Sequence, residues 1–217
     1  MLRTARRWLL LVLTSTGGVL AGAGAVAEDL SGDIADAQAH LQAGRWPAAI
    51  AALERTVQSH PEQTEAWLLL GAALLDTGQW SAARNAFDAA SRLAPDNVTA
   101  WRGLARANLA LDEQIAALAA LTSAMALSAE SGSRDPWLWQ QLGAIRLTMQ
   151  QADGAVQAFT TALEIDPAAA EIWRALAAAE SARGQWDAAA RALEVAGELE
   201  PLVEPWVELG RLATAAA

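Results

Sequence analysis

Apolar residues along this chain recur with the spacing of amphipathic helices. In the stretch 64–97, Trp67, Leu70 and Leu74 stand at positions i, i+3 and i+7, which lie on one face of a helix. Gly71 falls on the same side, where the absence of a side chain lets a neighbouring helix approach closely. The pattern therefore predicts a helix that packs along this face.

A second helix is predicted in the same stretch. Gly78 is typical of the residue that ends a helix, and Ala83 and Phe87 after it again share a helical face. Pro95 follows the last apolar residue and prevents the helix from continuing. The stretch 64–97 is thus predicted to be a hairpin of two helices, which is too small to bury its apolar face alone and must stack on similar neighbours.

The neighbours are present, because the key residues of this hairpin recur along the chain at a fixed step. Trp67 is matched by Trp101, and Pro61 by Pro95. Five repeats are predicted, followed by a shorter helix at 204–217: 30–63, 64–97, 98–131, 136–169 and 170–203. In each repeat the first helix has a small residue and the second a large apolar one: Ala37 and Leu53, Gly71 and Phe87, Ala105 and Leu121, Gly143 and Phe159, Ala177 and Leu193.

The 34-residue period with the W-x2-L-G motif and a closing proline resembles the tetratricopeptide repeat (TPR) family. The resemblance covers the chain from residue 30 onward. It implies an all-α fold, a right-handed superhelical solenoid of helix-turn-helix units closed by the helix 204–217. It also implies a scaffold for protein-protein interaction, in which the first helices line a groove that holds a partner peptide or helix.

Residues 1–27 have the features of a secretory signal peptide. Arg3, Arg6 and Arg7 precede an apolar run, and Ala25-Val26-Ala27 forms a cleavage motif, so we expect cleavage after Ala27 and export to the periplasm. An uncleaved membrane anchor is the alternative, but small and hydroxyl residues dilute the run below the length of a spanning helix. Without the leader, 12 arginines face 25 acidic residues, a net charge of −13. Such a surface repels nucleic acids and anionic membranes, so neither is an expected partner.

Composition and motifs also argue against catalysis and cofactors. The chain has no cysteine, and its two histidines, His40 and His60, have no second ligand nearby in sequence, so no metal site is predicted. No nucleophile-base arrangement or phosphate-binding loop occurs. We expect a non-enzyme without cofactors. The tryptophans at Trp46, Trp67, Trp80, Trp101, Trp139, Trp173 and Trp186 are interpreted as core residues.

The period slips between the third and fourth repeats. The step from Trp101 to Trp139 is longer than the step from Trp67 to Trp101, and Ala129 stands where a proline is expected, which places the surplus at 131–135. The insertion is either a tolerated loop or a hinge or partner-contacting segment. Asp135 is placed to cap the next helix, with Pro136 in its first turn, and Trp137 is off the packing column, where it could be exposed.

The resemblance implies that the partner-binding groove is lined by first-helix residues beside the packing columns: Leu68, Leu75, Arg102, Arg106, Leu109, Gln140 and Arg174, together with Trp137. Arg102 and Arg106 lie one helical turn apart, with no acidic residue at i±3 or i±4. They either bind an acidic or carboxylate-bearing partner, or are solvated or paired with a neighbouring repeat. Arg174 has Glu171 as a potential partner on its own helix.

Two functions remain open at this stage. The first is a periplasmic scaffold, such as an assembly factor, that binds a protein segment in its groove. The second is a structural component of an envelope complex, for example in polysaccharide export or secretion. The sequence leaves the oligomeric state undetermined, and a defined oligomer would favour the second.

Overall fold

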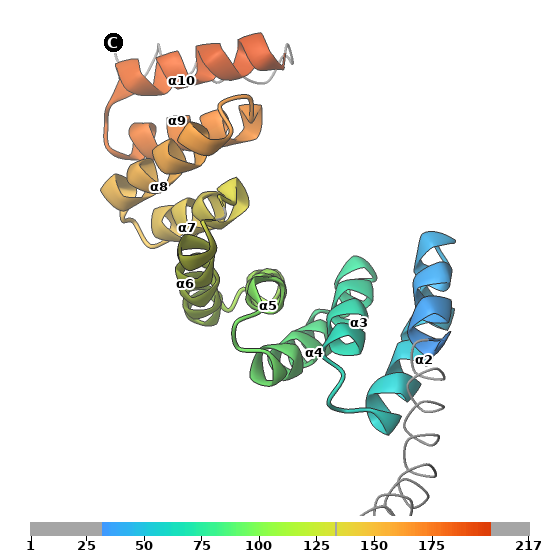
Figure 1. Cartoon of the computed structure of the whole chain (residues 1–217). Helices are drawn as coiled ribbons and strands as arrows, with labels where there is room; N and C mark the ends of the chain where they lie inside the picture. The colour runs from blue at the N-terminus through green and yellow to red at the C-terminus, as the bar shows by residue number, and fades with distance from the viewer. Residues whose placement is uncertain (1–31, 133, 201–217) are drawn as a thin grey trace, which may run out of the picture. The chain divides into compact units, whose positions relative to one another are not determined.

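The computed structural model describes residues 32–132 and 134–200 (Figure 1). The predicted signal peptide 1–27 and the predicted closing helix 204–217 lie outside these residues, so both stay predictions. All regular structure in the described ranges is helical. The predicted all-α helical-repeat solenoid is confirmed.

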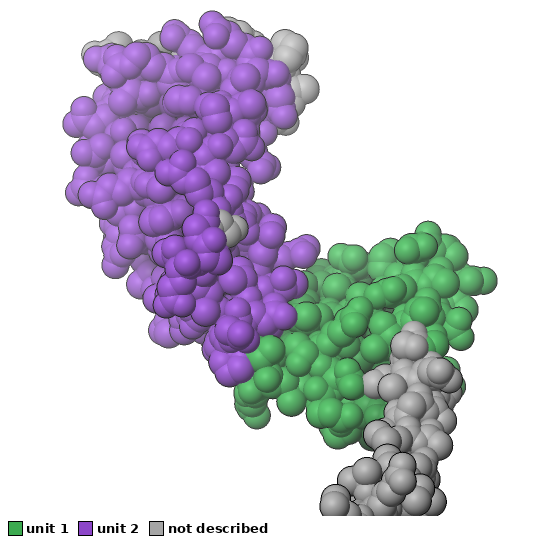
Figure 2. Space-filling model, in the orientation of Figure 1, with its two compact units in different colours: residues 1–94 green, residues 95–217 purple. Residues whose placement is uncertain are grey.

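The helices follow one another in pairs. Residues 32–42 are helical, and the later helices are α2 (Trp46–Ser59), α3 (Thr64–Asp76), α4 (Trp80–Leu93), α5 (Val98–Ala110), α6 (Gln114–Ser131), α7 (Pro136–Thr148), α8 (Ala152–Ile165), α9 (Ala170–Ala182) and α10 (Trp186–Leu199). Two compact units divide the chain at residues 94 and 95 (Figure 2). The first contains α2 to α4 and the second contains α5 to α10. Each is described by itself.

The turns inside the hairpins share one backbone conformation. Gly78 ends α3 with a φ of +76°, and Gly44 and Gly184 have φ values of +67° and +74° at the matching positions. This left-handed conformation suits glycine, which has no side chain to clash with the backbone. The third and fourth repeats use Asp112 and Gln150 there, with φ values of 58° and 60°. The prediction that Gly78 terminates the first helix is confirmed.

The two helices of a hairpin meet closely where a glycine faces an aromatic ring. A methyl group built at Gly71 would lie 2.9 Å from two ring carbons of Phe87. One at Gly143 would lie 2.7 Å from Cε1 of Phe159. Both rings are buried, with exposed fractions of 3% and 1%. The small residue of the first helix thus makes room for the large residue of the second within the same repeat.

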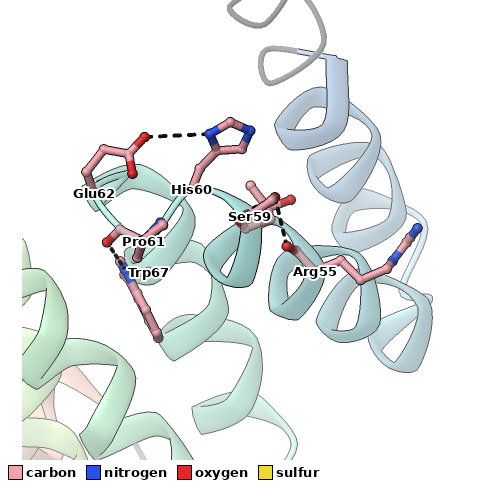
Figure 3. A network of polar contacts seen from close by, with 7 residues as sticks. Arg55, Ser59, His60, Pro61, Glu62 and Trp67 are labelled. Carbon is pink, nitrogen blue, oxygen red and sulfur yellow. Dashed lines mark hydrogen bonds and ion pairs between the residues drawn. The ribbon is translucent and has the colours of Figure 1, made fainter.

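Three of the seven tryptophans interpreted as core residues are anchored at the turns between repeats. The indole N–H of Trp67 donates to the carbonyl of Pro61 at 2.9 Å (Figure 3). Trp101 and Trp173 make the same bond to the carbonyls of Pro95 and Pro167, at 2.8 and 2.9 Å. Trp80 differs, because 39% of it is exposed, so its interpretation as a core residue is wrong.

The insertion between the third and fourth repeats lengthens a helix. α6 has 18 residues, whereas α4, α8 and α10 have 14 each. α6 continues to Ser131 and ends at Gly132, whose φ is 68°. The surplus that the sequence placed in a loop is therefore spent largely on an extra helical turn. After it, Asp135 caps α7 as predicted, with its Oδ1 accepting from the backbone N–H of Trp137 at 3.0 Å.

Candidate partner-binding surfaces

The predicted groove residues lie on the first helices of both compact units. Leu68 and Leu75 belong to α3 in the first unit. Leu68 is half-buried, whereas Leu75 has an exposed fraction of 6%. Little of the Leu75 side chain is therefore exposed in this structure. Leu68 has the larger exposed area of the two, and their role as partner contacts stays a prediction.

In the second unit, Arg102 on α5 is held by the start of the next repeat. Its Nη1 lies 3.1 Å from Oδ2 of Asp135, and its guanidinium carbon lies 5.0 Å from the ring centre of Trp137. Asp135 thus binds Arg102 with one carboxylate oxygen and caps α7 with the other. These contacts of Arg102 with Asp135 and Trp137 link the third and fourth repeats, and we call them the clasp. Of the two alternatives for Arg102, the structure supports pairing with a neighbouring repeat.

Trp137 belongs to the same clasp. It is half-buried and packs against the core cluster that contains Leu121 and Leu138. The arginine covers it, a cation-π arrangement that stabilises the pair. Part of Trp137 is thus used in a contact between repeats, and its role as a partner contact stays a prediction. Leu109 is likewise half-buried and packs against this cluster.

Arg106 lies one helical turn beyond Arg102 and is exposed. It forms no ion pair with any carboxylate in the ranges 32–132 and 134–200. Its guanidinium therefore presents a positive charge on the surface formed by the first helices α5, α7 and α9 of the second unit, which we call the first-helix surface. Its N–H groups are available as hydrogen-bond donors there. Among the predicted cations it is the one that the described part of the protein leaves without an acidic partner.

The remaining predicted residues lie on α7 and α9. Gln140 is half-buried. Arg174 is also half-buried, and its Nη1 lies 3.0 Å from Oε2 of Glu200, which follows α10. Its partner is therefore this distant glutamate and not Glu171, the potential partner on its own helix. The pair is partly solvated, so a ligand carboxylate could compete with Glu200 for the guanidinium.

Both histidines lie in the first compact unit. Nδ1 of His60 lies 3.6 Å from Oε1 of Glu62, in the turn between α2 and α3 (Figure 3). His40 is half-buried in the preceding helix. In the part of the chain that the structure describes, no three histidine or acidic side chains gather closely enough to hold a metal. No helix in those ranges is both long and apolar enough to cross a membrane.

Sequence reasoning missed a groove beside the lengthened helix α6. Two hollows, of about 310 and 650 Å³, lie between α6 and the helices that follow it, and both are lined by Met125, Ala129 and Trp139. We call their union the α6 groove. The signal that could have revealed it is Ala129, which stands where other repeats have the closing proline.

The paired helices, the glycine-aromatic contacts and the tryptophan-proline bonds define a helical-repeat protein. The family model described as Tetratricopeptide repeat matches residues 40–109 and 146–209, more than half of the sequence. The chain belongs to the tetratricopeptide repeat family. Its fold is a scaffold for protein-protein interaction, and members of the family bind protein or peptide partners.

Solved structures agree on the fold. The crystal structure of MamA protein is 24% identical, with a TM-score of 0.73 over 79% of this chain and 92% of that one. YrrB, described as a TPR protein with an unusual peptide-binding site, is 18% identical, with a TM-score of 0.71 over 82% and 90%. TTC0263, described as a thermophilic TPR protein in Thermus thermophilus, is 21% identical, with a TM-score of 0.60 over 85% and 99%. A comparison with curated protein sequences finds no match.

Proposed function

We propose that this protein is an exported scaffold that binds an acidic or carboxylate-bearing segment of a partner on the first-helix surface of its second unit. The observation that carries the proposal is Arg106, an exposed cation on α5 without an acidic partner among the described residues. Arg106 lies on the first helix of its repeat, and the first helices are where the family resemblance places the partner groove, so a binding role accounts for an exposed cation at this position.

The neighbouring residues support the same class of ligand. Arg174 is half-buried, and its pair with Glu200 is partly exposed. Gln140 adds polar contact area on α7 of the same unit. A peptide-binding site is named for YrrB, whose fold this chain shares, and a peptide is the ligand class that we propose here. Arg102 has a different task, since the clasp with Asp135 and Trp137 holds two repeats together.

Replacing Arg106 with alanine is expected to weaken partner binding by about 1–3 kcal/mol, the range for hydrogen bonds to charged groups. Stability should hardly change, because the exposed side chain contacts no acidic group in the described ranges. The measurement is affinity capture from an envelope extract with wild-type and variant protein side by side, quantified by mass spectrometry. The affinity of the captured partner is then measured by titration calorimetry.

Arg191→Ala is the matched control, because it removes another exposed arginine, from α10, which is the second helix of its repeat. It should leave partner binding unchanged. The wild-type affinity should also fall with added salt, because the contact is solvent-accessible. Equal capture by wild type and Arg106→Ala would exclude Arg106 as a partner contact.

Export is the second part of the proposal, and it rests on the arginines and the cleavage motif of residues 1–27. Expressed with its own leader in a Gram-negative host, the protein should accumulate in the periplasm with Glu28 as its first residue. N-terminal sequencing of the periplasmic material checks this. Recovery of the chain in the membrane fraction with Met1 in place would show instead that residues 1–27 are retained as a membrane anchor.

A structural role in an envelope complex, such as polysaccharide export or secretion, is the alternative. It predicts that residues 28–217 form a defined oligomer in size-exclusion chromatography. A monomer that captures a partner through Arg106 would favour the scaffold.

A further inference from the structure

The α6 groove has one apolar wall from α6 and another from α7. Its wider part is lined by Leu118, Met125 and Ala129 of α6 and by Trp139, Leu142 and Arg146 of α7. The narrower part continues past Trp139 to Gly132, Asp135 and Ile165 at the end of α8. All these residues belong to the second compact unit.

The groove exists because the third repeat ends differently from the others. In regular repeats the chain turns at a proline whose carbonyl accepts the indole N–H of the next tryptophan, as Pro167 does for Trp173. The corresponding position before Trp139 holds Ser133, and the matching place in α6 holds Ala129. The helix continues for another turn, and Trp139 lines both hollows beside it.

The dimensions of the groove suit a peptide. Its lining extends along α7, from Asp135 before the helix to Met149 after it. At about 1.5 Å per residue, this helix is about 20 Å long, which an extended strand of roughly six residues covers. A small molecule would occupy only part of such a length. Apolar side chains of a peptide can sit on Met125 and Trp139, which line both hollows.

The charges along the groove define the ligand further. Arg146 is half-buried, and its Nη1 donates to the carbonyl of Gly154 at 3.1 Å. No carboxylate of the described residues pairs with it. Arg134 lines the other end and is exposed, also without an ion pair in those ranges, while Asp135 is neutralised by Arg102. The groove is therefore cationic in a chain of formal net charge −10.

A buried polar group also points to a ligand. Ser128 lines the narrower hollow with an exposed fraction of 5%, and its Oγ has no hydrogen-bond partner among the described residues. Such a group costs free energy when it stays unpaired, so it usually has a partner in the functional state. The Oγ is buried in this structure, so a group of a bound peptide supplies that partner only after the Ser128 side chain rotates toward the hollow.

We propose that the α6 groove is a second binding site, which takes an apolar peptide segment that carries carboxylates. The apolar side chains lie on Met125 and Trp139, and a carboxylate pairs with Arg146. This site is independent of the surface around Arg106. Trp139, Leu142 and Arg146 stand at i, i+3 and i+7 on α7, on a different face from Gln140 of the first-helix surface.

The test uses a library of random dodecapeptides displayed on phage, selected against the full-length protein. Enriched peptides should combine two or more apolar residues with Asp or Glu. Their affinities are measured by fluorescence anisotropy with synthetic copies. Ala129→Trp places an indole in the groove and should weaken these peptides about tenfold or more. Ala119→Trp, at another exposed alanine of α6 outside both hollows, should leave binding unchanged.

Two further variants test whether peptide binding depends on Arg146 and whether it is independent of Arg106. Arg146→Ala should lower the affinity for acidic peptides by about tenfold, which corresponds to the loss of one charge-assisted hydrogen bond. The affinity for copies with Asn and Gln in place of the acidic residues should fall much less. Arg106→Ala should leave binding to this groove unchanged, which separates the site from the proposed first-helix surface. Circular dichroism checks that each variant is folded. Peptides that bind folded Ala129→Trp as tightly as wild type, a selection without enrichment, or a basic consensus would each overturn the proposal.

Discussion

Replacing Phe87 with alanine is expected to lower the free energy of unfolding of the first compact unit by about 3–5 kcal/mol. Phe87 has an exposed fraction of 3%, and its ring lies against Gly71 of the preceding helix. Glycine has no side chain that could move into the space, so most of the volume of the ring would remain as a cavity. The contact lies inside one repeat, so the cavity opens between its two helices.

Urea denaturation followed by far-ultraviolet circular dichroism measures this loss. The midpoint of the urea transition of Phe87→Ala should shift to lower urea than that of wild type. Arg92→Ala, at a residue whose side chain is 77% exposed on the same helix, is the control and should change stability by less than about 0.5 kcal/mol. An unchanged midpoint for Phe87→Ala would mean that the ring is not part of the core.

The repeat architecture was predictable because the same residue types recur at the same spacing in successive repeats. Trp67 and Pro61 are informative together, since both their spacing and their residue types recur one repeat later at Trp101 and Pro95. Helical periodicity then assigns one face of each helix to packing. The glycine-phenylalanine contacts follow from the same columns, because a small residue in one helix always accompanies a large one in the next.

The surface was less predictable, because a helical face does not reveal which neighbour covers it. Leu75 shares a face with positions expected to line a groove, yet it is buried. Arg102 has no acid one turn away on its own helix, and its partner Asp135 is the last residue of the insertion, directly before the fourth repeat. Spacing rules for a single helix do not extend to contacts between repeats.

The lengthened α6 could have been anticipated from its composition. The run from Gln114 contains many alanines, which favour helix, and neither proline nor glycine interrupts it before Gly132. Family resemblance pointed to a turn near Ala129, but helix propensity decided the outcome there. The groove beside α6 depends on how far α6, α7 and α8 separate, which one sequence does not specify.

The second large effect concerns the close contact of Gly143 with Phe159. Gly143→Ala places a methyl group 2.7 Å from a carbon of a ring with an exposed fraction of 1%, so the ring or the helices must shift. We expect a loss of about 1–3 kcal/mol from overpacking. Alanine is the better helix former by about 1 kcal/mol, so the measured loss understates the steric cost.

The third repeat contains the compensating pair, Ala105 and Leu121, within one core cluster. Adding Phe159→Leu to Gly143→Ala copies this pair into the fourth repeat and should recover part of the lost stability. Phe159→Leu alone should cost about 1–2 kcal/mol, because it leaves space beside a glycine. The double variant should be more stable than the sum of the single effects by at least about 1 kcal/mol, which is the coupling expected of residues in contact.

Urea denaturation of the four proteins, wild type included, measures the coupling directly. Losses that add to within about 0.5 kcal/mol would show that the two positions do not compete for the same space. A favourable coupling would explain why repeats that alternate between glycine with phenylalanine and alanine with leucine stack in one array. Each repeat would then have to keep the combined volume of these two side chains constant, whichever residues supply it.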